Sequence, residues 1–513
     1  MQETIPGCSL RTDDPDRIRR IRDVLDRAGY GEARVQELLG HAAPTGARPL
    51  LTRDRPLLLR RSAADPILGV LARLFLLRAS VDLDAARRAI APTDLEDWEA
   101  VGLLGRDGAG VSALAAVLPA ASLRIALSYG DRDAAFRGGD NDVVMSPQSA
   151  TTRLTDQYLI RRPVEAALDV CTGCGALGLY CSGHARRVVV ADYSPAAVRT
   201  AAFNGLLNDL PDFQSRQGDF FAPVDGETFD QIVCNPPFVI SPRQPGDADY
   251  MVYRDAGRPA DAVSEHVVRS LPRFLRPGGF AQSLINWVHV RGEDTPERLR
   301  AWTAGSGCDA WIYRINTLDA ADYVAVWIHP PKDYSDKYIA PFEHWVSYFE
   351  RERIEAISYG LITLRARPAG RNWFVCTPPP RVEGPCGDDL AAFFERRTLV
   401  ESSDDQALLG LRLRVGPSVR WRQEWRRERD DRVDGSVLIE RPQGLAHILS
   451  LDGNAWEVVN RLTGERPLGA VLAELAEGWG EPLSAVIPAC LRLVHVLLQN
   501  GFVDGMSEGA ASP

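Results

Sequence analysis

The sequence predicts an α/β protein with a doubly wound parallel sheet at its centre and helical domains at both ends of the chain. Between about residues 164 and 330, strand-like apolar runs alternate with helical segments, which is the pattern of a parallel sheet covered by helices. Before and after that region, apolar residues recur at the spacing of amphipathic helices. A chain of 513 residues has room for about two to four domains of ordinary size.

The composition is that of a globular protein and argues against several functional classes. Hydrophobic residues make up 45% and charged residues 25% of the chain. No run approaches the ~20 apolar residues that span a bilayer, and the first ten residues lack a signal-peptide pattern, so we expect a cytoplasmic protein without a membrane partner. Nine scattered cysteines fit a reducing compartment. A net charge of −10 disfavours RNA as a partner without excluding it, because nucleic-acid affinity comes from basic side chains.

Residues 1–140 are predicted to form a helical, winged-helix-like domain. Asp14 or Asp16 can cap a first helix, whose apolar positions follow helical spacing: Ile18, Ile21, Val24 and Leu25. The apolar stretch 66–77 has the length of a buried helix. A helix end at 101–104, a glycine-rich turn at 105–110 and a strand at 111–118 then follow.

Residues 141–345 are predicted to form the sheet domain, with seven strands of which the last two pair antiparallel. Ser194 as N-cap and Pro195 at the first helical position open a helix over 195–207. Ligands of such sheets bind at the carboxyl ends of the strands. The strands expected from apolar runs are 164–170, 187–192, 229–234, 279–286, 310–315 and 323–328.

The remainder of the chain divides into two parts. Residues 346–435 are predicted to be an irregular connecting region, and its arginine-rich segment 420–432 favours an exposed, salt-bridged element over a phosphate-binding one. Residues 436–513 are predicted to be a small helical, winged-helix-like domain, with helices at 454–462, 468–479 and 483–500. This domain is interpreted either as a structural cap or as a module that binds a peptide.

The first motif with chemical content follows the strand at 164–170. Gly173, Gly175 and Gly178 are spaced so that backbone can approach a ligand without interference from Cβ atoms. Asp192, at the end of the next strand, offers a carboxylate that can hold two ribose hydroxyls. These features alone also fit a nicotinamide oxidoreductase or a non-catalytic cofactor-binding module. Cys171 and Cys174 have no second cysteine pair nearby, so no metal site is predicted.

The second motif is Asn235-Pro236-Pro237-Phe238, directly after the strand at 229–234. Its position at the carboxyl edge of the sheet is where this fold binds substrate. A rigid turn with a buried phenylalanine is the alternative interpretation.

With both motifs in order, the chain resembles the class I S-adenosylmethionine-dependent methyltransferases that carry the "small" methyltransferase domain. These include the release-factor glutamine methyltransferases and the ribosomal RNA guanine-N2 enzymes. The resemblance covers about residues 145–330 and includes the Gly218-Asp219-Phe220-Phe221 segment after the third strand. It implies a Rossmann-like methyltransferase sheet and S-adenosylmethionine as cofactor. The departure is at Ser149-Ala150, where the glutamine enzymes carry an acidic pair.

The resemblance also implies roles for residues. Asp192 would hold the ribose, Asp219 the adenine amino group, and Phe220 a face of the adenine. The cofactor-binding residues expected in this way are Asp169, Cys171, Thr172, Gly173, Gly175, Asp192, Tyr193, Asp219, Phe220 and Asn235.

The implied chemistry is methylation of a planar nitrogen, which is a poor nucleophile because its lone pair is delocalised. Asn235 Oδ1 and the Pro236 carbonyl would accept its two N–H bonds, and these fixed dipoles would stabilise the charge that develops on nitrogen. Phe238 would offer a flat face, and the prolines would stiffen the loop. Asn235, Pro236 and Phe238 are therefore the expected catalytic residues.

The identity of the methyl acceptor stays open at this stage. Pro237, Tyr250, Tyr253 and Arg254 are candidate substrate contacts, the last three in a long polar loop after the motif. The acceptor alternatives are a protein or peptide amide, an amino-acid-derived metabolite with the C-terminal module binding the substrate, and an RNA guanine.

Overall fold

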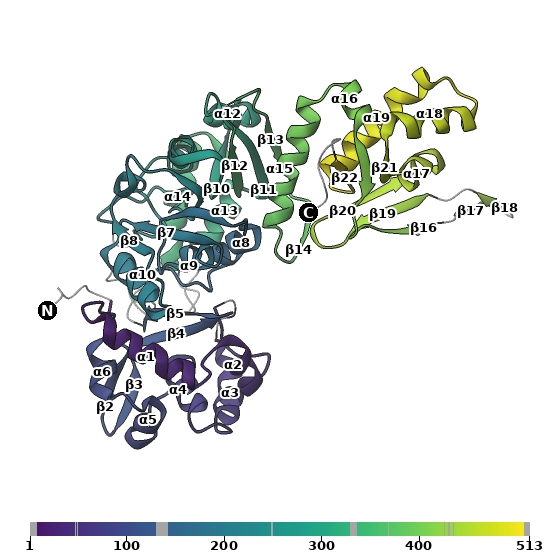
Figure 1. Ribbon diagram of the computed structural model, residues 1–513. Coiled ribbons are helices and arrows are strands. Elements are labelled where there is room, and N and C mark those ends of the chain that lie inside the picture. The colour runs from purple at the N-terminus through teal and green to yellow at the C-terminus, as the bar shows by residue number, and fades with distance from the viewer. Residues whose placement is uncertain are drawn as a thin grey trace. The chain divides into compact units, whose positions relative to one another are not determined.

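A computed structural model describes residues 8–46, 48, 50–129, 142–247, 250–328, 336–367, 369–424, 426–428, 431–433 and 436–506. It divides into two compact units (Figure 1). The first comprises residues 1–156 and 163–378, and the second comprises 157–162 and 379–513. The first seven residues, which the signal-peptide prediction concerned, lie outside the described residues.

The first unit begins with helices, as predicted. Asp14 caps the first of them, because its side chain accepts a hydrogen bond from the backbone N–H of Arg17 at 2.9 Å. The apolar stretch at 66–77 forms a buried helix at its centre. The elements are α1 (Pro15–Arg27), α2 (Glu32–Leu39), η1 (Thr52–Asp54), α3 (Arg55–Ser62), α4 (Leu68–Phe75), α5 (Leu83–Ile90) and α6 (Leu95–Ala100).

Short strands follow these helices, and they differ from the prediction. β2 (Leu104–Asp107) and β3 (Gly110–Ala113) form a tight hairpin, so the turn is shorter than the expected 105–110. The single strand expected at 111–118 is wrong, because the chain leaves β3 at Leu114 and starts β4 (Ala115–Ala120) in another sheet. β1 (Val81–Asp82) pairs with β3, and β4 pairs with β5 (Leu123–Ser128).

The centre of the first unit is a sheet with the order β13-β11-β12-β10-β9-β6-β7-β8. Neighbouring strands are parallel except β12, which is antiparallel to β10 and β11. The strands are β6 (Val164–Val170), β7 (Ala185–Asp192), β8 (Phe213–Gln217), β9 (Phe229–Cys234), β10 (Leu275–Val290), β11 (Cys308–Asp319), β12 (Ile354–Ala366) and β13 (Phe374–Thr377). The predicted doubly wound sheet is confirmed.

Helices cover this sheet and set the position of the site. Ser194 caps α10 by accepting from Ala197 N at 3.1 Å, as predicted.

The chain runs from β6 outward to β8 and then returns to β9 on the other side of β6. The carboxyl ends of β6 and β9 therefore meet at the switch point where such sheets bind ligands. The helices are α8 (Ala150–Tyr158), α9 (Ala176–Cys181), α10 (Pro195–Leu207), η2 (Ala222–Val224), α11 (Ala262–Ser270), η3 (Leu271–Phe274), α12 (Thr295–Thr303), α13 (Ala320–Trp327), η4 (Asp336–Tyr338) and α14 (Ile339–Arg351).

Two predictions about the end of the sheet are wrong. Residues 323–327 of the expected strand lie in helix α13, which Asp319 caps, and the antiparallel partner of β11 is β12. A six-residue apolar run does not distinguish a strand from a buried helix. Among the described residues the sheet has eight strands where seven were predicted, and it continues to Thr377, so the boundary at residue 345 lies too early.

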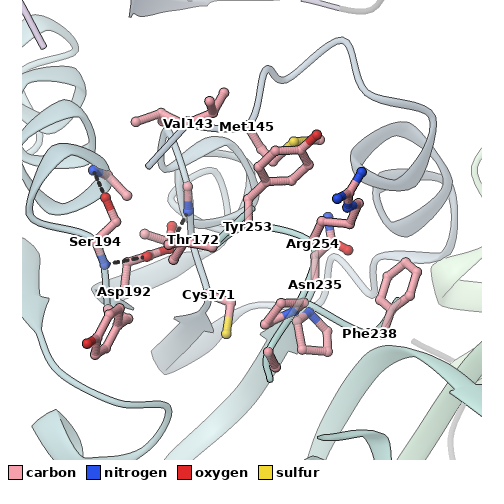
Figure 2. A pocket seen from close by; sticks show the side chains of 18 of the residues that line it. Val143, Met145, Cys171, Thr172, Asp192, Ser194, Asn235, Phe238, Tyr253 and Arg254 are labelled. Carbon is pink, nitrogen blue, oxygen red and sulfur yellow. Dashed lines mark hydrogen bonds between the residues drawn. The ribbon is translucent and has the colours of Figure 1, made fainter. Parts of the chain in front are cut away.

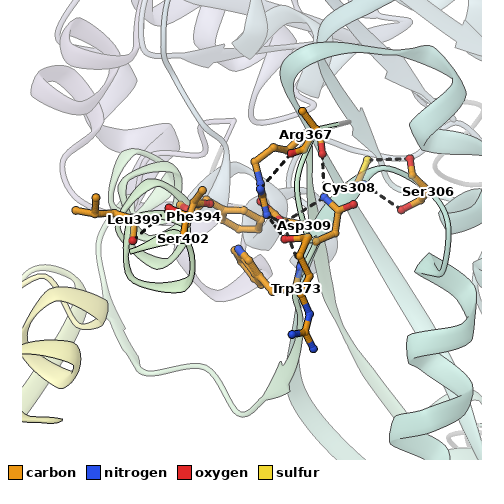
Figure 3. A network of polar contacts seen from close by, with 12 residues as sticks. Ser306, Cys308, Asp309, Arg367, Trp373, Phe394, Leu399 and Ser402 are labelled. Carbon is orange, nitrogen blue, oxygen red and sulfur yellow. Dashed lines mark hydrogen bonds and ion pairs between the residues drawn. The ribbon is translucent and has the colours of Figure 1, made fainter. Parts of the chain in front are cut away.

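A buried carboxylate ties the last strands together. Asp309, fully buried at the start of β11, accepts two bonds from the Arg367 guanidinium at 2.8 and 2.9 Å and one from Trp373 N at 3.2 Å (Figure 3). Arg367 follows β12 and Trp373 precedes β13, so this charged pair fixes both connections.

The irregular region predicted at 346–435 is wrong, because β12 and β13 of the first unit occupy its beginning and the second unit has regular structure in the remainder. Its elements before residue 436 are β14 (Arg381–Glu383), α15 (Gly387–Ser402), α16 (Asp405–Gly410), β15 (Arg412–Val415), β16 (Arg420–Gln423), β17 (Arg426–Glu428) and β18 (Asp431–Val433). All four residues of β16 are exposed, and Arg422 pairs with Glu424 at 3.4 Å. Residues 425, 429 and 430 of the arginine-rich segment lie outside the described residues.

The three helices predicted near the C-terminus are confirmed. They are α17 (Gly453–Asn460), α18 (Leu468–Trp479) and α19 (Leu483–Gln499), accompanied by β19 (Val437–Arg441), β20 (Gly444–Leu451), β21 (Thr463–Pro467) and β22 (Val503–Met506). The winged-helix character of this part stays a prediction. Among the described residues, none of the helices combines the length and apolarity that crossing a membrane requires.

Candidate active site

A cavity of about 690 Å³ opens at the switch point of the sheet (Figure 2). Its walls come from the turn after β6, the ends of β7 and β9, residues 142–152, and the loop between β9 and α11. Predicted residues that line it are Cys171, Thr172, Gly173, Asp192, Tyr193, Asp219, Phe220, Asn235, Pro236, Pro237, Phe238, Tyr250, Tyr253 and Arg254. The cavity thus joins the glycine turn to the Asn-Pro-Pro-Phe segment.

The turn between β6 and α9 needs its glycines for conformation and for space. Gly173 and Gly175 have φ angles of +56° and +85°, which favour glycine. A Cβ at Gly175 would lie 3.1 Å from the Ala201 Cβ, so Gly175 allows α10 to pack closely. Gly175 does not line the cavity, unlike Gly173.

Asp169 stabilises this turn by hydrogen bonds and does not line the cavity. The side chain is fully buried, and its Oδ2 accepts from Thr172 Oγ1 at 2.5 Å and from Gly178 N at 2.8 Å. Burial raises the pKa of this carboxyl to about 7, although the two hydrogen bonds favour the charged form.

Asp192 joins the end of β7 to the glycine turn. Its Oδ2 accepts from Gly173 N at 2.9 Å, and its Oδ1 accepts from Ser194 N at 3.0 Å. Burial raises the pKa of Asp192 to about 6, so the carboxylate is largely ionised at neutral pH. The next residue, Tyr193, is 63% exposed beside it.

Asp219 and Phe220 border the same end of the cavity. Phe220 is nearly buried, and the Arg258 guanidinium lies over its ring at 5.2 Å from the centroid. Arg258 also approaches Asp219 at 3.7 Å and lines the cavity. Arg258 was not predicted as a site residue, because its neighbours come from another part of the chain.

The Asn-Pro-Pro-Phe segment follows β9 at the other side of the cavity in Figure 2. Asn235 Nδ2 donates to Thr151 Oγ1 in the first turn of α8 at 3.2 Å. A hydrogen bond with the Cys234 thiol and burial raise the pKa of Cys171 well above its ordinary value, so the Cys171 thiol stays uncharged at neutral pH. Phe238 both lines the cavity and packs against the cluster around Tyr323 and Phe349.

The loop after the motif is held by Asp255, which is 1% exposed. Its carboxylate accepts from Ser241 Oγ at 2.9 Å, from Met251 N at 3.1 Å, and from Arg254 Nη2 at 2.7 Å. Arg254, a candidate substrate contact, lines the cavity, and its guanidinium is engaged by this carboxylate. Tyr250 and Tyr253 line the cavity beside it.

The site fits a nucleoside-type cofactor. Gly173, an acidic side chain at Asp192 and an aromatic ring at Phe220 surround one cavity, whose volume lies within the range of about 300–1,000 Å³ common for small-molecule sites. Within the part of the chain that the structure describes, there is no group of three or more His, Cys, Asp or Glu side chains that could hold a metal ion.

Known proteins share this region. The family model of the methyltransferase small domain matches residues 150–256, and that of a domain of unknown function matches residues 27–114. A release factor glutamine methyltransferase of Xylella fastidiosa (strain Temecula1) is 32% identical over 201 residues, which are 36% of this chain and 70% of the relative. This chain belongs to the methyltransferase family that includes that enzyme.

Two further matches cover parts of this chain. A ribosomal protein uL3 glutamine methyltransferase of Bradyrhizobium diazoefficiens is 30% identical over 34% of this chain and 61% of the relative. A solved ribosomal protein L11 methylase of Lactobacillus delbrueckii subsp. bulgaricus aligns with a TM-score of 0.24 at 15% identity, over 42% of this chain and 77% of that chain.

The predicted enzyme class and cofactor are confirmed. The chain is a methyltransferase, and its methyl donor is S-adenosylmethionine. The nicotinamide oxidoreductase interpretation of the glycine turn is therefore wrong. About two thirds of the chain lies outside the match to the curated relatives.

Proposed function

We propose that this methyltransferase transfers the methyl group to the side-chain amide nitrogen of a glutamine in a protein. The observation that carries the proposal is the Asn235 carboxamide, whose Nδ2 is engaged by Thr151 while the residue lines the cavity. That engagement leaves Oδ1 to accept an N–H bond from the substrate. The relatives named as glutamine methyltransferases of release factors and of a ribosomal protein support an amide acceptor.

S-adenosylmethionine would supply an electrophilic methyl group when bound. Asp192 would accept from its ribose hydroxyls, Gly173 would lie under its methionine part, and Phe220 would face its adenine. Asn235 Oδ1 and the Pro236 carbonyl would hold the acceptor amide and stabilise the charge that develops on its nitrogen. Phe238 would limit the tilt of the flat amide. A protein substrate of this kind fits the cytoplasmic location expected from the sequence.

The test incubates this protein and S-adenosylmethionine tritiated in its methyl group with an extract of cells that lack the protein. Label is expected in the protein fraction, and acid hydrolysis should release it as methylamine, because hydrolysis of a methylated side-chain amide frees that amine. Label confined to RNA, or to the small-molecule fraction, would contradict the proposal and support the guanine or metabolite alternatives instead.

A further inference from the structure

Asn235 can adopt two orientations that differ by a half-turn of its carboxamide. In one, Oδ1 is available to the acceptor nitrogen; in the other, Nδ2 is presented and repels the N–H groups that it should bind. The two ends of a carboxamide are similar in size, so shape alone does not select between them. Selection requires a neighbour that accepts from Nδ2 and cannot donate to Oδ1.

Thr151 is such a neighbour because of the hydroxyls behind it. Ser149 caps α8, since its Oγ accepts from Thr152 N at 3.0 Å. The same Ser149 hydroxyl donates its one proton to Thr152 Oγ1 at 2.8 Å. The contact of 3.2 Å between Ser149 Oγ and Thr151 Oγ1 must therefore use the Thr151 proton.

This series of hydrogen bonds, from Thr151 to Ser149 to Thr152, also decides how Thr151 bonds Asn235. With its proton directed to Ser149, Thr151 Oγ1 turns a lone pair to Asn235, where Nδ2 donates at 3.2 Å. A reversed carboxamide would place Oδ1 against an oxygen without a proton to give. The capping network of α8 thus imposes a direction on a side chain that follows β9, far away in the sequence.

We infer that Thr151 is a positioning residue for methyl transfer, which sets the orientation of Asn235 through its hydroxyl. This inference rests on the proposed role of Asn235 as acceptor of the substrate N–H bond. Thr151 acts on the rate at which bound substrate reacts, and the affinity for cofactor depends on other residues such as Asp192.

The test compares Thr151→Val, which keeps the shape and removes the hydroxyl, with Thr151→Ser, which keeps the hydroxyl. At saturating cofactor, T151V is expected to lose about tenfold or more of the methylation rate, as fixed dipoles at a reacting centre usually do when disturbed. T151S should retain most of the rate. Binding of S-adenosylhomocysteine, measured by calorimetry, should change by less than about twofold in either variant.

Thr155→Val is the matched control, because Thr155 is buried in the same helix and its hydroxyl bonds only the Thr151 carbonyl, at 3.0 Å, among the contacts described. A T151V rate equal to the wild-type rate, or equal losses in T151V and T151S, would overturn the inference. The rate is measured on whichever fraction the wild type labels, so an RNA acceptor would contradict the proposed amide substrate and leave this comparison valid.

An Asn235→Asp background gives an independent readout. A carboxylate has two equivalent oxygens, so its orientation needs no selection. T151V should therefore cost nothing further when added to N235D, and a further tenfold loss in the double variant would count against the inference.

Discussion

Asn235 is the residue on which the proposed chemistry depends most directly. Replacement by Ala removes the oxygen acceptor and leaves Pro236, Pro237 and Phe238 in the cavity wall. We expect N235A to reduce methylation by about a hundredfold or more, which is typical when a fixed dipole at a reacting centre is removed. S-adenosylhomocysteine should bind within about threefold of wild type by calorimetry. A variant that keeps its turnover would exclude the assigned role of Asn235.

Asp192 makes cofactor binding depend on pH. Its pKa is raised to about 6 by burial, so the carboxylate takes up a proton as the pH falls through that value. Because the ribose hydroxyls need an ionised acceptor, we expect the affinity for S-adenosylhomocysteine to be full above pH 7 and to fall between about pH 6.5 and 5. Calorimetry across this range measures the effect.

The Asp192→Asn variant distinguishes the effect of Asp192 on binding from that of Asp169, whose pKa is raised to about 7. The variant should bind more weakly at pH 7.5 and show little pH dependence below it. A pH dependence that persists in D192N would assign the effect to Asp169 and contradict the prediction.

The sequence predicted residues that line the cavity where a local motif carries the signal. Gly173, Asp192 and Asn235 each lie at or just after the end of a strand that an apolar run predicted, and the parallel topology brings those strand ends together. Thr151 and Arg258 also line the cavity and were not predicted, because their contacts with Asn235, Phe220 and Asp219 join parts of the chain that are distant in sequence. Arg254 was assigned to the substrate, yet the adjacent Asp255 engages it, which composition alone does not show.

At the scale of elements, the loop between β9 and α11 forms one wall of the cavity. Asp255 stabilises this loop from within, because its buried carboxylate accepts hydrogen bonds from Ser241, Met251 N and Arg254. We expect Asp255→Asn to loosen the loop, since an amide cannot replace a carboxylate beside two arginines. Trypsin should then cut faster after Arg243 or Arg254, as mass spectrometry of the fragments would show.

Asp247→Asn is the control in the same loop. Asp247 accepts from Gln244 N at 2.8 Å near the exposed part of the loop, so D247N should leave the cleavage rate near that of wild type. Equal protection of D255N and wild type would show that Asp255 does not anchor the loop.

Prediction of elements was most accurate where periodicity and caps agreed. Ser194 and Pro195 marked the start of α10, and the apolar runs marked β6 and β9. The strand predicted at 323–328 is wrong because a short apolar run fits a strand and a buried helix equally. The N-cap residue Asp319, which favours the helix, precedes that run. β12 was missed because it follows α13 and α14 in the sequence, whereas it lies between β10 and β11 in the sheet.

At the largest scale, one hydrophobic cluster of the first unit contains residues of the N-terminal elements together with residues of α9 and α10, while the core strands of the sheet contribute to a second cluster. Buried residues of α1, α4 and β4 belong to the same cluster as Phe203 and Leu207 of α10. The domain boundary expected near residue 140 therefore does not separate two independent cores. The second unit has its own cluster, built largely from α18 and α19.

Asn204 of α10 is the polar link within that shared cluster. It is fully buried; its Oδ1 accepts from Ala126 N at 2.7 Å, and its Nδ2 donates to Ala126 O at 3.0 Å and to Cys174 O at 2.8 Å. These hydrogen bonds join β5 to the glycine turn between β6 and α9 through one side chain. Asn204→Ala would leave three backbone groups without partners in a buried place.

We expect N204A to lower the free energy of unfolding by about 3 kcal/mol, because each unpaired buried group costs about 1–3 kcal/mol and some will rehydrate. Urea unfolding followed by circular dichroism measures this loss, and Asn454→Ala, at an exposed position of α17, is the control. Because Cys174 belongs to the glycine turn, N204A should also weaken S-adenosylhomocysteine binding. Unchanged unfolding in N204A would mean that the N-terminal strands and the sheet domain are stabilised separately, and that the methyltransferase part does not depend on the elements before it.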